Sequence, residues 1–140
     1  TASPAASEMN LAQKIADLAE ANMVNIAGQT NLKQLLAVVA GASLVIAPDS
    51  GTAHMAVTQN TPTIGLYAHS NPRRTGPYLY PALTVDAYHD NLQRLFSDSA
   101  KTPKWGTRLK GAHLMQDISL SEVITKVDDV LGALPLSGDL

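Results

Sequence analysis

The chain has 140 residues, and its composition already excludes several classes of protein. Ten Lys and Arg against twelve Asp and Glu give a net charge of −2, without the basic surplus expected of a general nucleic-acid binder. Because there is no cysteine, disulfides, thiol catalysis and Cys-ligated zinc are excluded. No apolar run approaches the roughly 18–20 residues of a membrane-spanning helix. The sequence starts without Met or a secretory signal, so we expect a piece of a longer protein.

The first third of the chain is expected to alternate between helices and short strands. Apolar side chains recur at helical spacing over residues 8–22, with Ser7 as a candidate N-cap. Residues 23–27 form a short strand-like run that ends at a glycine. A second helix is predicted over residues 31–39, with Asn31 as its cap.

The middle of the chain gives the clearest signals. Residues 43–47 are apolar at consecutive positions, as in a strand covered on both faces. A helix over 52–59 and a second buried strand over 62–67 follow, then an irregular loop over 68–81 and one more short strand over 83–85. This alternation predicts a Rossmann-like α/β domain, a parallel sheet with helices on both faces.

The last third is predicted to be irregular before a final helix. Residues 95–111 are polar and broken by Gly and Pro, with Trp105 as the single large anchor. A helix then runs from about 120 to 134, and Ser119 with Glu122 fits a capping box at its start.

The strongest candidate for a binding site follows the strand over 43–47. Ligands of parallel α/β sheets bind beyond the carboxyl ends of the strands, and a helix start offers unpaired N–H groups to an anion such as phosphate. Gly51 permits close approach of the backbone, and Ser50 and Thr52 add hydroxyl donors. The same position also holds Asp49, which can accept from hydroxyls, and His54 one helical turn further on. A capped helix without a ligand is the alternative interpretation.

Two further turns follow predicted strands. Gln29 and Thr30 could line a pocket for a base or ribose, although a glycine turn that caps a helix is the simpler interpretation. Arg73 and Arg74 offer guanidinium groups for phosphate or carboxylate, or serve only as exposed charge on a loop.

Other site types find little support. A Ser50–His54 hydrolase is a third alternative, but the nucleophile elbow requires Gly where this chain has Pro48 and Thr52. The remaining histidines lack metal-ligand spacing, and neither the dinucleotide nor the P-loop glycine signature occurs.

Several segments together carry a family resemblance. They read NIAGQTNLKQL over 25–35, AGASLVIAPDSGTAHMA over 40–56, TPTIGLY over 61–67 and NPRRTGPY over 71–78. In this order they resemble the C-terminal domain of the ADP-heptose:lipopolysaccharide heptosyltransferases, glycosyltransferase family 9. MQDISLSEVI over 115–124 is similar to the start of that family's closing helix.

The resemblance implies a GT-B enzyme, in which two Rossmann-like domains face each other and the C-terminal one holds most of the nucleotide-sugar donor. Residues 1–140 would form one partial domain of that half. The donor diphosphate and its sugar would lie at Asp49, Ser50 and Gly51, with His54 near the same phosphates and the Gln29–Thr30 turn near the adenosine. The implied donor is an ADP-sugar, the acceptor is the lipopolysaccharide core, and neither a metal nor another cofactor is needed.

The resemblance also implies what these residues do not supply. The general base and the acceptor surface belong to the family's N-terminal domain, and the first strand of the C-terminal domain would precede Thr1. We therefore expect no catalytic residue in this chain, no activity from it alone, and self-association through an exposed edge or apolar patch. The implied location is cytoplasmic, with peripheral attachment to the inner face of the bacterial inner membrane as an option. A non-catalytic nucleotide- or phosphate-binding module is the alternative function.

Overall fold

The computed structural model describes residues 5–97, 99–100 and 102–133, and its contacts divide the chain into two compact units. The first unit comprises residues 1–38 and the second residues 39–140.

The first unit begins with a helix that is shorter than predicted. Helix α1 spans Ala6–Leu18, and Ala5 occupies the N-cap, so Ser7 lies inside the helix and its assignment as the cap is wrong. The chain leaves helical geometry at Ala19. Because α1 buries no residue, tertiary packing does not support another turn toward residue 22.

The strand predicted over 23–27 does not form. The side chain of Asn25 accepts a hydrogen bond from the backbone N–H of Ala27 at 3.1 Å, which occupies a donor that a strand ladder would use. Gly28 then turns the chain with a φ of +70°. The prediction of a strand from β-branched and apolar residues is wrong, because local turn hydrogen bonds replace strand pairing. Val24, one of these residues, is 82% exposed.

The structure confirms the second helix, which the sequence predicted over residues 31–39. Helix α2 spans Leu32–Ala40. The Gln34 backbone N–H donates to Asn31 Oδ1 at 2.9 Å, and the Asn31 N–H donates to Gln34 Oε1 at 2.9 Å. This reciprocal pair is a capping box, and it confirms Asn31 as the N-cap.

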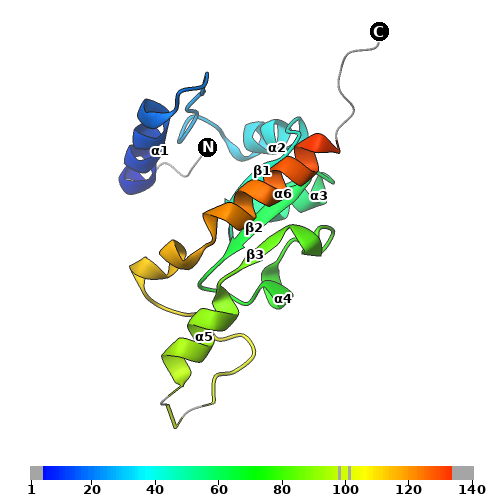
Figure 1. The fold of residues 1–140 in the computed structure, drawn as a ribbon. Coiled ribbons are helices and arrows are strands. Elements are labelled where there is room, and N and C mark those ends of the chain that lie inside the picture. The colour runs from blue at the N-terminus through cyan, green and yellow to red at the C-terminus, as the bar shows by residue number, and fades with distance from the viewer. Residues whose placement is uncertain (1–4, 98, 101, 134–140) are drawn as a thin grey trace. The chain divides into compact units, whose positions relative to one another are not determined.

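The second unit contains a three-stranded parallel sheet in the order β1-β2-β3 (Figure 1). Helix α3 connects β1 to β2 and contacts both strands, and α6 contacts β2. β1 is an edge of the described sheet and its Ile46 is 48% exposed, so this strand is less covered than its apolar run predicted. The fold class and the predictions near 43–47, 52–59, 62–67 and 83–85 are confirmed by β1 (Val45–Pro48), α3 (Gly51–Thr58), β2 (Thr63–Tyr67) and β3 (Thr84–Asp86).

Two helices lie where none was predicted. The loop over 68–81 contains the short helix α4 (Pro72–Thr75), because Asn71 caps it by accepting from the Arg73 N–H at 3.0 Å and Pro72 fits its first position. Helix α5 (Tyr88–Phe96) follows β3, and at its start Asp86 Oδ1 accepts from the Tyr88 N–H at 2.9 Å. Apolar residues recur four apart at 88, 92 and 96 in this helix, a signal that the sequence contained.

The remaining elements are short 3₁₀ turns and a final helix. The turns are η1 (Pro81–Leu83) and η2 (Ala112–Asp117). Helix α6 (Leu120–Gly132) confirms the predicted C-terminal helix, and Ser119 Oγ accepts from the Glu122 N–H at 3.2 Å as its cap. The predicted end at Leu134 lies outside the described residues. No described helix combines the length and the apolar character needed to cross a membrane.

A core cluster forms beyond the carboxyl ends of β2 and β3. Trp105 is 64% exposed and lies outside this cluster, so its assignment as the anchor of the irregular segment is wrong. The anchor is Leu109, 5% exposed, because it reaches the apolar space that α5 helps to enclose. The buried members of the cluster are Ala68, Ala87, Tyr88, Leu109 and Leu114.

Candidate functional site

The turn between β1 and α3 presents free backbone donors. Ser50 is the N-cap of α3 in extended geometry (φ −152°, ψ 165°), but its side chain makes no capping hydrogen bond. The first backbone bond of the helix runs from the His54 N–H to the Ser50 carbonyl at 3.3 Å, so the N–H groups before it have no acceptor within the helix. The alternative in which Ser50 serves as a hydrogen-bonding cap therefore does not hold. Such a helix start favours an anion.

Gly51 leaves the approach to these donors open. A Cβ atom placed on Gly51 would meet no other atom within 4 Å. The fold therefore does not require glycine here, and the empty space in front of the backbone is available to a ligand. Thr52, half-buried in the first turn, and Ser50 place hydroxyl groups at the same helix start.

The Asp49 carboxylate faces two basic side chains. Its Oδ1 lies 3.7 Å from His54 Nε2, and its Oδ2 lies 3.8 Å from Arg108 Nη1. The Asp49 side chain is 15% exposed, whereas those of His54 and Arg108 are 53% and 69% exposed. Both separations exceed hydrogen-bond length, so these are loose ion pairs, and the pair with His54 is charged only when the imidazole is protonated.

The Asp49 carboxylate also affects the pKa of Tyr67, which lies at the end of β2. Burial of the phenol, and secondly the negative charge of Asp49, raise the pKa of Tyr67 to about 12, against the lowering effect of its bond to Thr75. The Tyr67 hydroxyl donates to the Thr75 carbonyl at 2.7 Å, which ties the end of β2 to α4.

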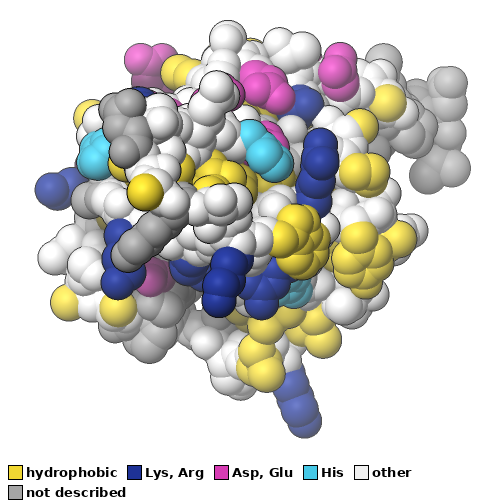
Figure 2. Space-filling view, turned by 90° about the horizontal axis from the view of Figure 1, so that it is seen from below, with side chains coloured by type: hydrophobic (Ala, Val, Ile, Leu, Met, Phe, Trp, Pro, Cys, Tyr) yellow, Lys and Arg dark blue, Asp and Glu magenta, His cyan; other side chains and the backbone are white. Residues whose placement is uncertain are grey.

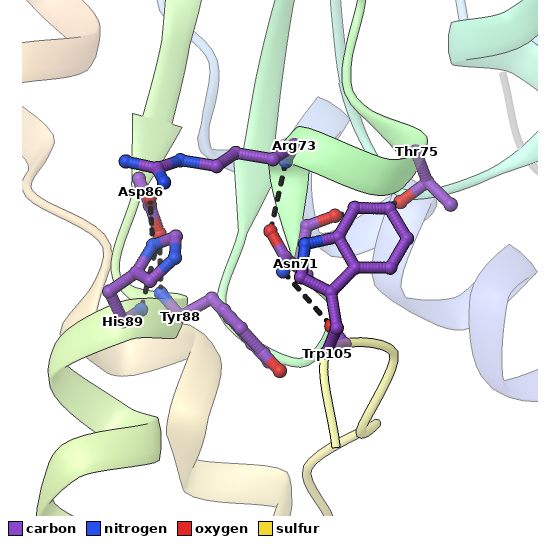
Figure 3. A network of polar contacts seen from close by, with 7 residues as sticks. All are labelled: Asn71, Arg73, Thr75, Asp86, Tyr88, His89 and Trp105. Atoms are coloured by element: carbon purple, nitrogen blue, oxygen red, sulfur yellow. Dashed lines mark hydrogen bonds and ion pairs between the residues drawn. The ribbon is translucent and has the colours of Figure 1, made fainter. Parts of the chain in front are cut away.

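Arg108 was not among the predicted site residues. It lies in residues 105–109, which we call the strap, a segment without helix or strand whose backbone is bonded to residues at the carboxyl ends of β2 and β3. Asn71 donates to the Trp105 carbonyl at 3.0 Å, and Figure 3 shows its side chain between the start of α4 and Trp105. No local sequence motif predicts such a segment, because its hydrogen-bond partners are distant in sequence.

The two arginines of α4 do not contact Asp49 in the described residues. Arg74 Nη1 donates to the Gly106 carbonyl at 3.4 Å and so helps to hold the strap. Arg73 is exposed, and together with Arg74 and Asp86 it lines a groove of about 510 Å³. The structure thus brings together residues 49–52, His54 and Arg108, and leaves the α4 arginines beside them.

Exposed basic residues occur both in α4 and in the segment that carries the strap. They are Arg73, Arg74, Lys104, Arg108 and Lys110. The view from below in Figure 2 shows Lys and Arg side chains gathered on one face of the molecule beside hydrophobic ones.

The Gln29–Thr30 turn belongs to the first unit. Gln29 Nε2 donates to the Asn25 carbonyl at 3.1 Å, and the preceding Gly28 is left-handed. Both observations agree with the simpler interpretation, a turn that leads into α2. A role of this turn near a base or ribose stays a prediction.

The hydrolase alternative gains no support from the geometry. The His54 ring lies near Asp49, and within the described part of the chain no hydrogen bond joins the Ser50 hydroxyl to the His54 ring; the bond between these two residues runs through their backbones. The described residues also contain no group of three or more His, Asp or Glu side chains that could hold a metal ion.

Comparison with known proteins identifies the family. The model of glycosyltransferase family 9 (heptosyltransferase) matches residues 1–105. The chain is 47% identical over 122 residues to the lipopolysaccharide core heptosyltransferase OpsX of Haemophilus influenzae, covering 87% of this chain and 35% of that protein. It is 30% identical over 108 residues to lipopolysaccharide heptosyltransferase 2 of Escherichia coli, covering 76% of this chain and 28% of that protein.

The chain therefore spans about a third of the length of these curated relatives. No solved structure matches it. The family model covers most of the chain, including the β1–α3 turn and α4, and the chain belongs to glycosyltransferase family 9, the heptosyltransferases.

Proposed function

We propose that this chain is the donor-binding part of a heptosyltransferase and that the diphosphate of an ADP-sugar binds at the start of α3. One observation carries the proposal: the first N–H groups of α3 lack helical acceptors, Ser50 does not cap them, and the space before Gly51 is open. A helix start at the carboxyl end of a parallel strand is in general a suitable binding site for a diphosphate.

The geometry suits the charge that develops during glycosyl transfer. When the glycosidic bond breaks, the departing nucleoside diphosphate gains negative charge, which the α3 N–H groups and helix dipole stabilise. His54, one turn inside α3, donates from its ring to a phosphate oxygen, most strongly when protonated. Asp49 accepts from hydroxyls of the donor sugar.

The acceptor and the general base come from outside these residues in this proposal. The relatives named above are lipopolysaccharide heptosyltransferases, so we propose transfer of heptose, or a related sugar, to the lipopolysaccharide inner core, at the inner face of the inner membrane. The 140 residues alone are expected to bind donor without transferring it. Self-association through the β1 edge stays an expectation of the same kind.

Calorimetric titration with ADP tests the proposal. Gly51→Val should abolish measurable binding, because the added side chain occupies the space that phosphate oxygens need. His54→Ala should weaken binding by a factor of about 5–30, the loss of one charge-assisted hydrogen bond. Thermal unfolding of each variant is the control for folding. If both variants bind ADP as the unaltered chain does, the turn is only a helix start and the proposal fails.

A further inference from the structure

We propose that Arg108 is a further donor-binding residue, which places a guanidinium against the diphosphate at the start of α3. The inference rests on the proposed function and adds to it a residue from a segment 54 positions after His54.

The strap is an irregular segment, but hydrogen bonds to distant residues fix its position. Besides Asn71 on the Trp105 carbonyl, the Tyr88 hydroxyl donates to the Thr107 carbonyl at 2.7 Å. The backbone N–H of Leu109 donates to the His69 carbonyl at 2.8 Å, and the His69 ring is 3.2 Å from the Leu109 carbonyl.

These bonds fix the backbone on both sides of Arg108. Thr107 is held from α5, and Leu109 is held from the end of β2 and buried in the core cluster. The position of the Arg108 backbone is therefore determined by the fold, although its side chain remains 69% exposed. Because the backbone is already in place, a ligand that Arg108 binds has to order only the side chain and not the whole segment.

Arg108 offsets the charge of the Asp49 carboxylate at the start of α3. Asp49 is 15% exposed and carries a negative charge beside the N–H groups that the diphosphate would occupy. An uncompensated carboxylate there would repel the ligand. Arg108 brings the sum of the two side-chain charges to zero, so the positive end of the α3 dipole determines the local sign. Without Arg108, His54 would be the one basic side chain among the described residues within ion-pair distance of Asp49.

The guanidinium keeps donors for a ligand. Its contact with Asp49 is 3.8 Å, longer than a hydrogen bond, and within the described residues it makes no hydrogen bond. The five N–H donors of arginine form a planar fork that matches two phosphate oxygens, which a lysine ammonium cannot reproduce. An exposed ion pair at this distance adds little to the stability of the fold. If Arg108 served only that pair, its replacement would have little effect on stability or on the affinity for ADP.

Calorimetric titration with ADP tests this assignment on the full 140-residue chain, with thermal unfolding run on the same samples. Arg108→Gln should weaken ADP binding about tenfold, and Arg108→Lys should recover only part of that loss. Lys110→Gln removes the same charge from the residue after the strap and should change affinity less than about twofold. The unfolding midpoints of all three should match that of the unaltered chain.

The outcomes separate this inference from the proposed function. If Gly51→Val abolishes ADP binding and Arg108→Gln does not weaken it, the inference is wrong and the donor site stands. An equal loss in Lys110→Gln, or a lowered unfolding midpoint in both Arg108 variants, would also overturn it, as general charge or structure would then be the cause. If the unaltered chain does not bind ADP, both the site and the inference fail.

Discussion

The two segments that meet at Asp49 are built in opposite ways. The turn into α3 is local: an apolar strand, a short polar connection and a helix start within a few residues determine where its donors point. The strap is held by side chains between 19 and 40 positions away. The position of one segment therefore follows from its own sequence, whereas the other is positioned by hydrogen bonds to distant residues and by the burial of Leu109.

Leu109→Ala should have the largest effect on stability. It tests the strap separately from the turn into α3. It removes a buried side chain from the core cluster, so the free energy of unfolding should fall by about 2–5 kcal/mol. Urea denaturation measures this change. Leu79→Ala, at a residue 49% exposed, is the control and should cost less than about 1 kcal/mol. Equal losses in the two variants would mean that Leu109 does not anchor the strap.

Much of the local segment could be predicted from sequence, and little of the strap. The strand near 43–47 and the helix over 52–59 follow from apolar runs and a helix-start motif, and Asn31 and Ser119 from capping chemistry. Helix α5 was missed although its apolar spacing was present. The strand over 23–27 was predicted wrongly, because residue preferences do not reveal the Asn25 turn bond that replaces pairing.

Asn71→Ala should give the next largest loss. The Asn71 side chain, 7% exposed, accepts from the Arg73 N–H and donates to the Trp105 carbonyl, so its removal leaves partners of both α4 and the strap unpaired. The free energy of unfolding should fall by about 1–3 kcal/mol.

Asn71→Asp separates the contribution of the bond to α4 from that of the bond to the strap. The carboxylate keeps the acceptor for the Arg73 N–H and loses the donor to Trp105, so urea denaturation should show an intermediate loss. Stability equal to that of the unaltered chain would show that the bond to the strap contributes nothing.

Tyr67→Phe should cost about 1 kcal/mol, since the Thr75 carbonyl loses its donor. It should also alter the response to alkali. The pKa of Tyr67 is about 12 in the folded chain and 10.0 in the reference state, so its contribution is complete below pH 10 and is lost as the pH rises toward 12. Urea denaturation across this range should show a smaller alkaline loss in the variant.

A remaining alkaline loss is expected in that variant, because burial, and secondly Asp86, also raise the pKa of Tyr88. An alkaline loss identical to that of the unaltered chain would contradict the assignment to Tyr67.

Gly51→Val should have the smallest effect on stability. A Cβ atom there meets no other atom within 4 Å, so the free energy of unfolding should change by less than about 0.5 kcal/mol. Urea denaturation checks this directly. A loss of several kcal/mol would show that the glycine serves the fold of the α3 turn, and would remove the argument that its open space serves a ligand.

The most direct test of the donor site is a titration of the ¹⁵N-labelled chain with ADP, followed by NMR. The backbone amide resonances of Ser50, Gly51 and Thr52 should shift first and most, with those of the strap following. Saturating shifts confined to other parts of the chain, with these three amides unmoved, would show that the diphosphate does not bind at the start of α3.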